Sequence, residues 1–211
     1  MAEVMTPKPV VLAEGESVRA AARVLFEAGV GGAPVVDAAG RLVGVVSERD
    51  LLEKEAALHA AFRGAADADR RRRARTVGQI CTRPARTTSP ETTLRAVARR
   101  LIDERVARLV VVDDGRIVGI VTRHDVLGVL LRPDRELRAA VVELLRQAGV
   151  GDVHVGVRDG VVCVRGVVAR RSQRTDVLGA VALVDGVVDV EDDLGWRSDD
   201  ISAHAPHPHP G

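Results

Sequence analysis

Aromatic residues are almost missing from this chain of 211 residues, which has two phenylalanines, one tryptophan and no tyrosine. Proteins that hold single-stranded nucleic acid stack the bases on aromatic rings, so the composition argues against that class. Basic and acidic residues nearly cancel, at 31 and 30, and a net charge of +1 offers no general attraction for nucleic acid. The core must be built from valine, leucine, alanine and isoleucine, which pack well without rings.

Cysteine, lysine and long apolar runs are also scarce. Cys81 and Cys163 lie far apart and form no C-x-x-C pair, which favours a reduced, cytoplasmic protein in which both are small apolar residues. The N-terminus has no signal-peptide pattern, and no apolar run approaches the ~18 residues that span a bilayer. Because 29 of the 31 basic residues are arginine, the composition resembles that of GC-rich coding, and arginine-rich stretches are weak functional signals.

A phrase of seven residues occurs twice. Gly44 to Asp50 reads G-V-V-S-E-R-D, and Gly119 to Asp125 reads G-I-V-T-R-H-D. Each copy follows a strand-like run and leads into a helix-like run. The hydroxyl can donate to a phosphate oxygen, and the aspartate one helical turn later can accept from a ribose diol. Since a strand that ends at a helix start also directs backbone N–H groups toward an anion, the phrase contains the parts of a nucleotide site.

The residues before the phrase are repeated as well. The lead-in Val4–Pro7 matches Ile80–Pro84, and the hairpin Val35–Gly44 matches Val111–Gly119. The offset of 76 residues falls to 75 after the turn, because the second copy lacks one turn residue. Self-similarity at a fixed period indicates one supersecondary unit used twice. Each unit is predicted to hold a lead-in, a helix, two strands joined by a turn, and an exit helix; Ser17 is the expected N-cap of the first helix.

The two copies resemble CBS domains in tandem, known as a CBS pair or Bateman module, over about residues 1–131. The resemblance implies an α+β fold of two βαββα-type units with pseudo-twofold symmetry. The first repeat is expected at 1–60 and the second at 77–131, with an arginine-rich linker at 61–76. CBS pairs often dimerise into a flat disc, so the resemblance also implies a homodimer.

The resemblance further implies that an adenine nucleotide binds in one or both clefts between the repeats, as AMP, ADP, ATP or another adenosine-containing ligand. Asp50 and Asp125 would accept from the ribose, and Ser47 and Thr122 would donate to phosphate or ribose oxygens. The charge of the phosphates would be balanced by Arg49, Arg123 and His124.

The base would be held near the lead-in of the same repeat and near the small residues that open the first hairpin. Glycines at 31 and 32 permit the close approach of a base, or form an ordinary tight turn, and both readings stay open. Cys81 stands where the first repeat has Met5, and Val110 stands where it has Pro34. The identity of the base in the second site therefore stays open. The base-pocket candidates are Thr6, Val11, Gly32, Ala33, Thr82 and Leu109.

A third unit follows Pro133, with a helix, a hairpin, a second helix expected to start at Ser172, and a strand, in the order αββαβ. The segments R-D-G-V-V-x-V-x-G-V-V and V-D-G-V-V-D-V resemble a BON domain over about residues 134–195. The resemblance implies a membrane-surface or protein-interaction module. Residues 196–211 are expected to be a disordered tail whose alternating prolines leave its three histidines without a preformed metal site.

Motifs of catalysis are missing: the chain has no P-loop, no H-E-x-x-H and no G-x-S-x-G, so no catalytic residues, metal site or enzyme activity are expected. We expect a regulatory protein that senses an adenine nucleotide through the CBS pair and passes the signal to the BON domain. The alternative is an adaptor with vestigial sites whose BON domain docks on a membrane surface or a protein partner. A solvated linker is favoured for Arg70–Arg75 over a basic handle for a polyphosphate, an acidic partner or nucleic acid, and nucleic-acid binding is the least favoured function.

Overall fold

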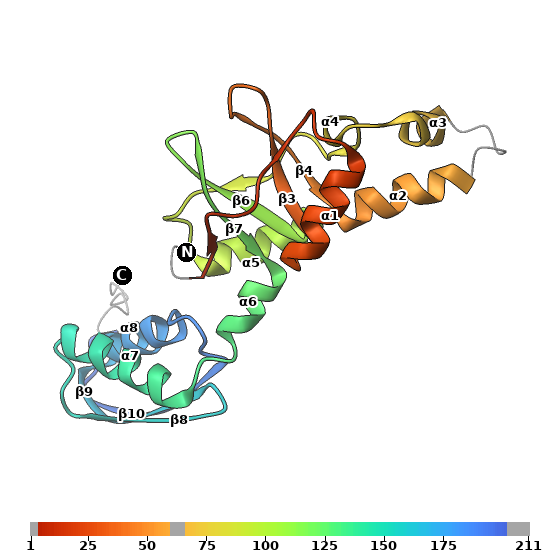
Figure 1. The fold of residues 1–211 in the computed structure, drawn as a ribbon. Coiled ribbons are helices and arrows are strands. Elements are labelled where there is room, and N and C mark those ends of the chain that lie inside the picture. The colour runs from red at the N-terminus through yellow and green to blue at the C-terminus, as the bar shows by residue number, and fades with distance from the viewer. Residues whose placement is uncertain (1–3, 60–65, 202–211) are drawn as a thin grey trace, which may run out of the picture. The chain divides into compact units, whose positions relative to one another are not determined.

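The computed structural model describes residues 4–59 and 66–201, and both helices and strands occur in each half of the chain (Figure 1). The chain divides into two compact units, with the boundary after Val126. The predicted α+β class is confirmed. None of the helices in the described ranges combines the length and apolar composition needed to cross a bilayer.

The first repeat packs one helix on a three-stranded sheet. Helix α1 (Val18–Ala28) begins where the Ser17 hydroxyl accepts from the Ala20 N–H (3.1 Å), as the sequence predicts. It ends at Gly29, whose φ of 62° is the left-handed conformation that glycine adopts most easily. The sheet has the order β2-β3-β4, with β2 parallel and β4 antiparallel to β3. The strands are β2 (Leu12–Ala13), β3 (Gly32–Val36) and β4 (Leu42–Ser47).

The second repeat copies this arrangement. Thr93 caps its helix, as Ser17 does in the first repeat, by accepting from the Ala96 N–H. Its sheet has the order β1-β7-β6-β5 and is covered by a core that includes Val97, Leu101 and Val121. The elements are β5 (Thr87–Thr88), α5 (Leu94–Asp103), β6 (Arg108–Asp113), β7 (Arg116–Thr122) and α6 (Arg123–Val129).

The lead-ins are exchanged between the repeats. Strand β1 (Thr6–Pro7) pairs with β7 of the second repeat, Thr6 opposite Ile120. Thr82 of the second lead-in in turn bridges to Val45 in β4 of the first repeat. The base-pocket prediction placed each lead-in with its own repeat, whereas in the structure Thr6 and Thr82 pair with strands of the other repeat. The exchange supplies partners for backbone N–H and C=O groups on strands that would otherwise be free edges.

The glycine that opens the repeated phrase makes room for the exchanged lead-in. A Cβ on Gly44 would lie 2.7 Å from the Thr82 carbonyl oxygen and 3.0 Å from the Cys81 sulfur. A Cβ on Gly119 would collide with the Met5 side chain. The phrase thus begins with glycine because the other repeat's backbone crosses over it at close range.

Between the repeats, the predicted linker is helical over residues 66–73. Helix α3 (Ala66–Arg73) packs on α2 (Glu48–His59), and the Lys54 ammonium donates to the Arg72 carbonyl (2.8 Å). A short helix α4 (Val77–Ile80) then enters the second repeat. The predicted end of the first exit helix and the first residues of the linker, at 60–65, lie outside the described residues.

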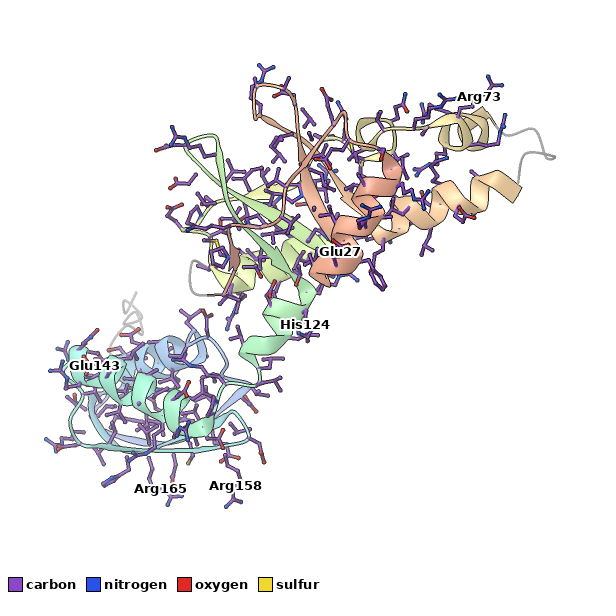
Figure 2. All side chains as sticks on the ribbon, viewed as in Figure 1. Glu27, Arg73, His124, Glu143, Arg158 and Arg165 are labelled. Carbon is purple, nitrogen blue, oxygen red and sulfur yellow. The ribbon has the colours of Figure 1, made fainter. Side chains whose placement is uncertain are left out.

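The second unit has the predicted order αββαβ. Its sheet, β10-β9-β8, has β9 antiparallel to β8 and parallel to β10, and helices α7 and α8 cover one face (Figure 1). On the other face, Figure 2 shows the side chains of Arg158 and Arg165 pointing away from the sheet. The elements are α7 (Asp134–Gln147), β8 (Val153–Arg158), β9 (Val161–Arg170), α8 (Arg171–Ala182) and β10 (Asp189–Ser198).

Two details of this unit differ from the prediction. The Ser172 hydroxyl donates to Asp200 (2.5 Å) instead of capping α8, which begins one residue earlier. Strand β10 runs to Ser198, three residues into the segment predicted as a disordered tail, because its pairing with β9 continues as far as Arg170. Trp196 is therefore part of the sheet, with guanidinium groups of Arg171 and Arg174 within 5.5 Å of its ring centre. The tail from residue 202 lies outside the described residues.

Candidate functional site

The hydroxyl and aspartate of each repeated phrase contact one another as a capping box. The Ser47 N–H and hydroxyl both donate to Asp50 Oδ2, at 2.8 and 2.6 Å. The Thr122 N–H and hydroxyl donate to Asp125 Oδ2 in the same way, both at 2.7 Å. These bonds satisfy donors at the start of α2 and α6, including N–H groups that an anion would otherwise use. Each carboxylate therefore caps its helix through one oxygen and keeps the other for further contacts.

The second oxygen of Asp50 faces a cleft between the repeats. Only 5% of Asp50 is exposed, and its Oδ1 accepts from the Thr82 hydroxyl at 3.2 Å. The cleft has a volume of about 540 Å³, within the size range of small-molecule pockets. Its walls come from both repeats and from α3: Gly31, Val45, Ser47, Glu48, Arg49, Asp50, Glu53, Arg71, Thr82, Pro84, Ala85, Arg86, Arg105, Val106, Ala107, Arg108 and Arg123.

Positive charge dominates this cleft, with six arginines against three carboxylates in its walls. Two arginines share the Glu53 carboxylate, which accepts from Arg49 Nε (2.8 Å) and lies 2.7 Å from Arg71 Nη1. The Arg71 contact is an ion pair without hydrogen-bond alignment, so among the described residues this buried Nη1 has no acceptor. Arg123 Nε donates to the Val106 carbonyl (3.1 Å), which holds the guanidinium at the wall.

The space over the first hairpin glycines is occupied by an arginine from the other repeat. A Cβ on Gly32 would collide with the Arg108 guanidinium, and one on Gly31 would lie 3.1 Å from Arg108 Nη2. These glycines therefore make room for an arginine side chain at the place where a base was one of the two predicted occupants. Burial lowers the pKa of Arg108, while the nearby carboxylates of Glu48 and Asp50 act in the opposite direction and favour its charge.

The predicted nucleotide-binding residues divide between this cleft and the rest of the first unit. Ser47, Arg49, Asp50 and Arg123 line the cleft, whereas Thr122, His124 and Asp125 do not. His124 is exposed on α6, where Figure 2 labels it. Of the base-pocket candidates, Thr82 lines the cleft; Gly32, Ala33 and Leu109 are buried in the sheets, and Thr6 and Val11 are exposed.

Apart from Arg123, the arginines that the second repeat brings to this cleft were not among the predicted site residues. Arg105 and Arg108 stand where the first repeat has Gly29 and Gly32, at the offset of 76 residues. Comparing the two repeats position by position would have shown these differences. Assigning them to the Asp50 cleft also required the crossing of the repeats, which the sequence pattern does not reveal.

Metal ligands do not gather anywhere in residues 4–59 and 66–201, where no group of three or more His, Cys, Asp and Glu side chains is placed to hold an ion. The tail histidines His204, His207 and His209 lie outside the described residues. Cys81 and Cys163 are both free thiols.

Known structures with this fold include ligand complexes. The CBSX2 protein, solved in complex with AMP, is 34% identical and matches 62% of this chain and 94% of its own, with a TM-score of 0.50. The CBS domain pair of protein MJ0100, solved with 5′-methylthioadenosine and S-adenosyl-L-methionine, is 25% identical over 60% of this chain and 95% of its own, with a TM-score of 0.51.

Two curated archaeal proteins are similar to part of this chain. A homoserine O-acetyltransferase of Methanococcoides burtonii is 32% identical over 127 residues, which are 60% of this chain and 23% of that protein. An uncharacterized protein of Methanocaldococcus jannaschii is 28% identical over 128 residues, 61% of this chain and 41% of its own length. The chain therefore spans less than half of either relative.

Family models match most of the chain. The CBS domain model matches residues 1–57 and 77–132, and the BON domain model matches residues 133–198. The two CBS matches coincide with the two sheets that exchange lead-ins, and the BON match with the αββαβ unit. The chain therefore belongs to the CBS domain family, as a tandem CBS pair followed by a BON domain.

Proposed function

We propose that this chain is a non-catalytic regulatory protein that senses an adenosine-containing nucleotide in the cleft around Asp50. The observation that carries the proposal is this cleft, where a carboxylate oxygen faces a volume of about 540 Å³ lined by arginines from both repeats. The structures of similar CBS pairs with AMP, and with 5′-methylthioadenosine and S-adenosyl-L-methionine, support an adenosine-containing ligand.

The ligand would use the parts of the cleft according to their chemistry. Asp50 Oδ1 accepts from the ribose hydroxyls after Thr82 gives up its 3.2 Å hydrogen bond, which is long for two oxygen atoms. Ser47 stays close to the ribose and keeps the helix capped. The guanidinium groups of Arg49 and Arg123 balance phosphate charge. Thr122, Asp125 and His124 would form the corresponding second site.

The signal would arise because the cleft has walls from both repeats. A ligand that contacts both repeats favours the packing in which those contacts are made, and it shifts the population only if it binds two arrangements with different affinity. Helix α6 starts inside the second repeated phrase and leads by a short connection to α7, the first helix of the BON domain. This is the covalent route from the CBS pair to the BON domain.

The similarity to homoserine O-acetyltransferase supports no transfer of that activity. The match covers 23% of that protein and 60% of this chain. CBS pairs are generally regulatory modules, and we propose no reaction for this chain.

We also propose a homodimer formed through the CBS helices. Phe26 on α1 is 88% exposed, and Ile102, at the equivalent position of α5, is 73% exposed. Leu52 on α2 is 69% exposed. Large apolar side chains at equivalent exposed positions of both repeats are suited to a symmetric partner. Sedimentation of the wild type and of Phe26→Glu tests this, and an unchanged mass of the variant would remove the interface.

A specific observation also favours the adaptor reading. The capping boxes account for the hydroxyl and aspartate of each phrase by helix stability alone, without a ligand. In that case the sites are vestigial, and the BON domain docks on a membrane surface or a protein partner. Co-sedimentation of the full chain with anionic and neutral vesicles, with and without nucleotide, separates a membrane adaptor from a nucleotide sensor.

The direct test of the sensor is calorimetry and thermal shift with AMP, ADP, ATP, NADH, S-adenosylmethionine and cyclic di-AMP. A ligand at ~100 times its dissociation constant stabilises by about 2.7 kcal/mol, a shift of a few degrees. Asp50→Asn keeps an acceptor for the helix cap and removes the charge. The matched control is Asp37→Asn, whose carboxylate likewise accepts backbone N–H groups, of Ala39 and Arg41, in a hairpin turn.

We expect Asp50→Asn to weaken nucleotide binding at least about tenfold, because a charged acceptor is lost, and Asp37→Asn to leave binding unchanged. Equal binding by the wild type and Asp50→Asn would mean that the ligand lies elsewhere. Absence of binding across the whole ligand series would leave the adaptor as the better reading.

A further inference from the structure

We propose that the cleft around Asp50, and not its counterpart around Asp125, is built for a ligand with two or more phosphates, such as a nucleoside di- or triphosphate. This inference rests on the proposed function and adds the phosphate chain to it. The charge of the cleft is its starting point, because one phosphate group is matched by one or two guanidinium groups. Six arginines against three carboxylates give the wall a formal excess of three cations, although Arg49 and Arg71 share Glu53 and Arg86 pairs with Glu104.

The first step is that the two repeats are not equivalent in charge. Arg86, Arg105 and Arg108 of the second repeat correspond to Val10, Gly29 and Gly32 of the first. Within the phrases, Arg123 corresponds to Glu48. Four positions of the second repeat thus carry a cation where the first repeat has a neutral residue or a carboxylate.

The second step is that the crossing of the repeats concentrates these cations at one site. The Asp50 cleft is lined by the second repeat's segments 82–86 and 105–108. By the pseudo-twofold relation, we infer that segments 6–10 and 29–32 face Asp125. Lys8 is their only basic residue, and the Asp125 phrase itself adds Arg123 and His124. Strand β1, at Thr6, is indeed paired with the strand that leads to Asp125. The two clefts therefore differ in charge although their phrases are alike.

The third step is that two of these arginines form no ion pair in the described residues, and a third, paired with Glu53, keeps a nitrogen without a hydrogen-bond acceptor. Arg105 holds a φ of 53° where the first repeat has Gly29, a conformation unfavourable for a side chain with a Cβ. In the described parts of the chain, neither Arg105 nor Arg123 forms an ion pair within 4.0 Å, and Arg71 Nη1 is buried without a hydrogen-bond acceptor. A chain of phosphates would supply acceptors for these donors.

The arginine bias of the whole chain does not explain this pattern. GC-rich coding favours glycine as much as arginine, so it does not select arginine in one repeat and glycine at the equivalent positions of the other. Arg71 extends the argument to the inter-repeat helix α3, since the arginine tract 70–75 places this residue in the wall of the same cleft.

The test measures the full chain by calorimetry with AMP, ADP and ATP at one ionic strength. One variant is Arg105→Gly with Arg123→Glu, which restores the first repeat's residues and relieves the backbone of Arg105. The matched control is Arg116→Glu, an exposed arginine on β7 outside the cleft. Inorganic tripolyphosphate serves as a probe without a nucleoside.

We expect the wild type to bind ATP at least about tenfold more tightly than AMP, since one extra charged hydrogen bond has that effect. The double variant should reduce this ratio to below about threefold, because each further phosphate loses a cation partner, and Arg116→Glu should retain the wild-type ratio. Equal affinity for the three nucleotides, or an unchanged ratio in the double variant, would overturn the inference and leave the proposed function intact.

Failure of the proposed function has a different signature, in which none of the nucleotides binds. In that case, the binding of tripolyphosphate tests the phosphate site without a nucleoside. Binding that Arg105→Gly with Arg123→Glu weakens would support a polyphosphate cleft without a nucleoside. No binding of tripolyphosphate to the wild type would overturn this inference as well.

Discussion

Alanine at position 32 would disturb the contact between the two repeats. A Cβ on Gly32 would collide with the Arg108 guanidinium, lie 2.7 Å from Arg108 Cζ and lie 2.6 Å from the Val46 carbonyl oxygen. A side chain and a backbone oxygen must therefore both move. Overpacking of this kind lowers the free energy of unfolding by about 1–3 kcal/mol, and the rigid Val46 backbone places Gly32→Ala in the upper half of that range.

A double-mutant cycle separates the two contributions. Gly32→Ala, Arg108→Ala and their combination are compared by urea unfolding of the full chain, followed by circular dichroism. Because Arg108→Ala removes one of the two collisions, the double variant should be more stable than the sum of the single effects by about 1 kcal/mol. That coupling exceeds the ~0.3–0.5 kcal/mol within which independent sites are additive.

Gly15→Ala is the control, since a Cβ there has no atom within 4 Å. It should change the free energy of unfolding by less than about 0.5 kcal/mol. Two results would refute the reasoning: effects of Gly32→Ala and Arg108→Ala that simply add, or a Gly32→Ala variant as stable as Gly15→Ala. Either would mean that Arg108 does not occupy the space left by the glycine.

Three further predictions concern stability. Gly166→Ala should destabilise the BON domain by about 2–4 kcal/mol, because φ is +143° and the Cβ would collide with the Asp152 carbonyl. Urea unfolding monitored by Trp196 fluorescence measures this, and a variant as stable as the wild type would contradict it. Gly179→Ala should stabilise α8 by about 0.5–1 kcal/mol in the same assay, since no atom lies within 4 Å of the added Cβ, and a loss of stability would show hidden crowding. The hydrogen bond from Arg49, with Arg71 nearby, holds the pKa of Glu53 below its ordinary value of 4.5. Stability from this carboxylate is therefore present above pH 4.5 and lost as the pH falls further. The wild type should lose its stability advantage over Glu53→Gln in acid. A difference in free energy of unfolding that stays constant with pH would exclude this contribution of Glu53.

The pattern of the chain was sufficient for features that depend on near neighbours. Ser17 caps α1 by a bond to a residue three positions later, and Gly29 ends it with its own backbone conformation. The bonds within each repeated phrase also span three residues. Such contacts depend on local chemistry, so the two repeats, their helices and the αββαβ order followed from the sequence.

Contacts between distant residues were decided by the tertiary structure alone. Thr82 reaches Asp50, and Arg108 lies against Gly32, only because the repeats pack about a pseudo-twofold relation and exchange their lead-ins. The repeat in the sequence shows that two units exist, but it does not show which sheet edge of one repeat packs against the other repeat. The charge of the Asp50 cleft depends on that pairing, because its arginines come mainly from the repeat that does not contain Asp50. The sequence by itself therefore determined the pair of phrases, and the packing of the repeats determined which phrase faces the cations.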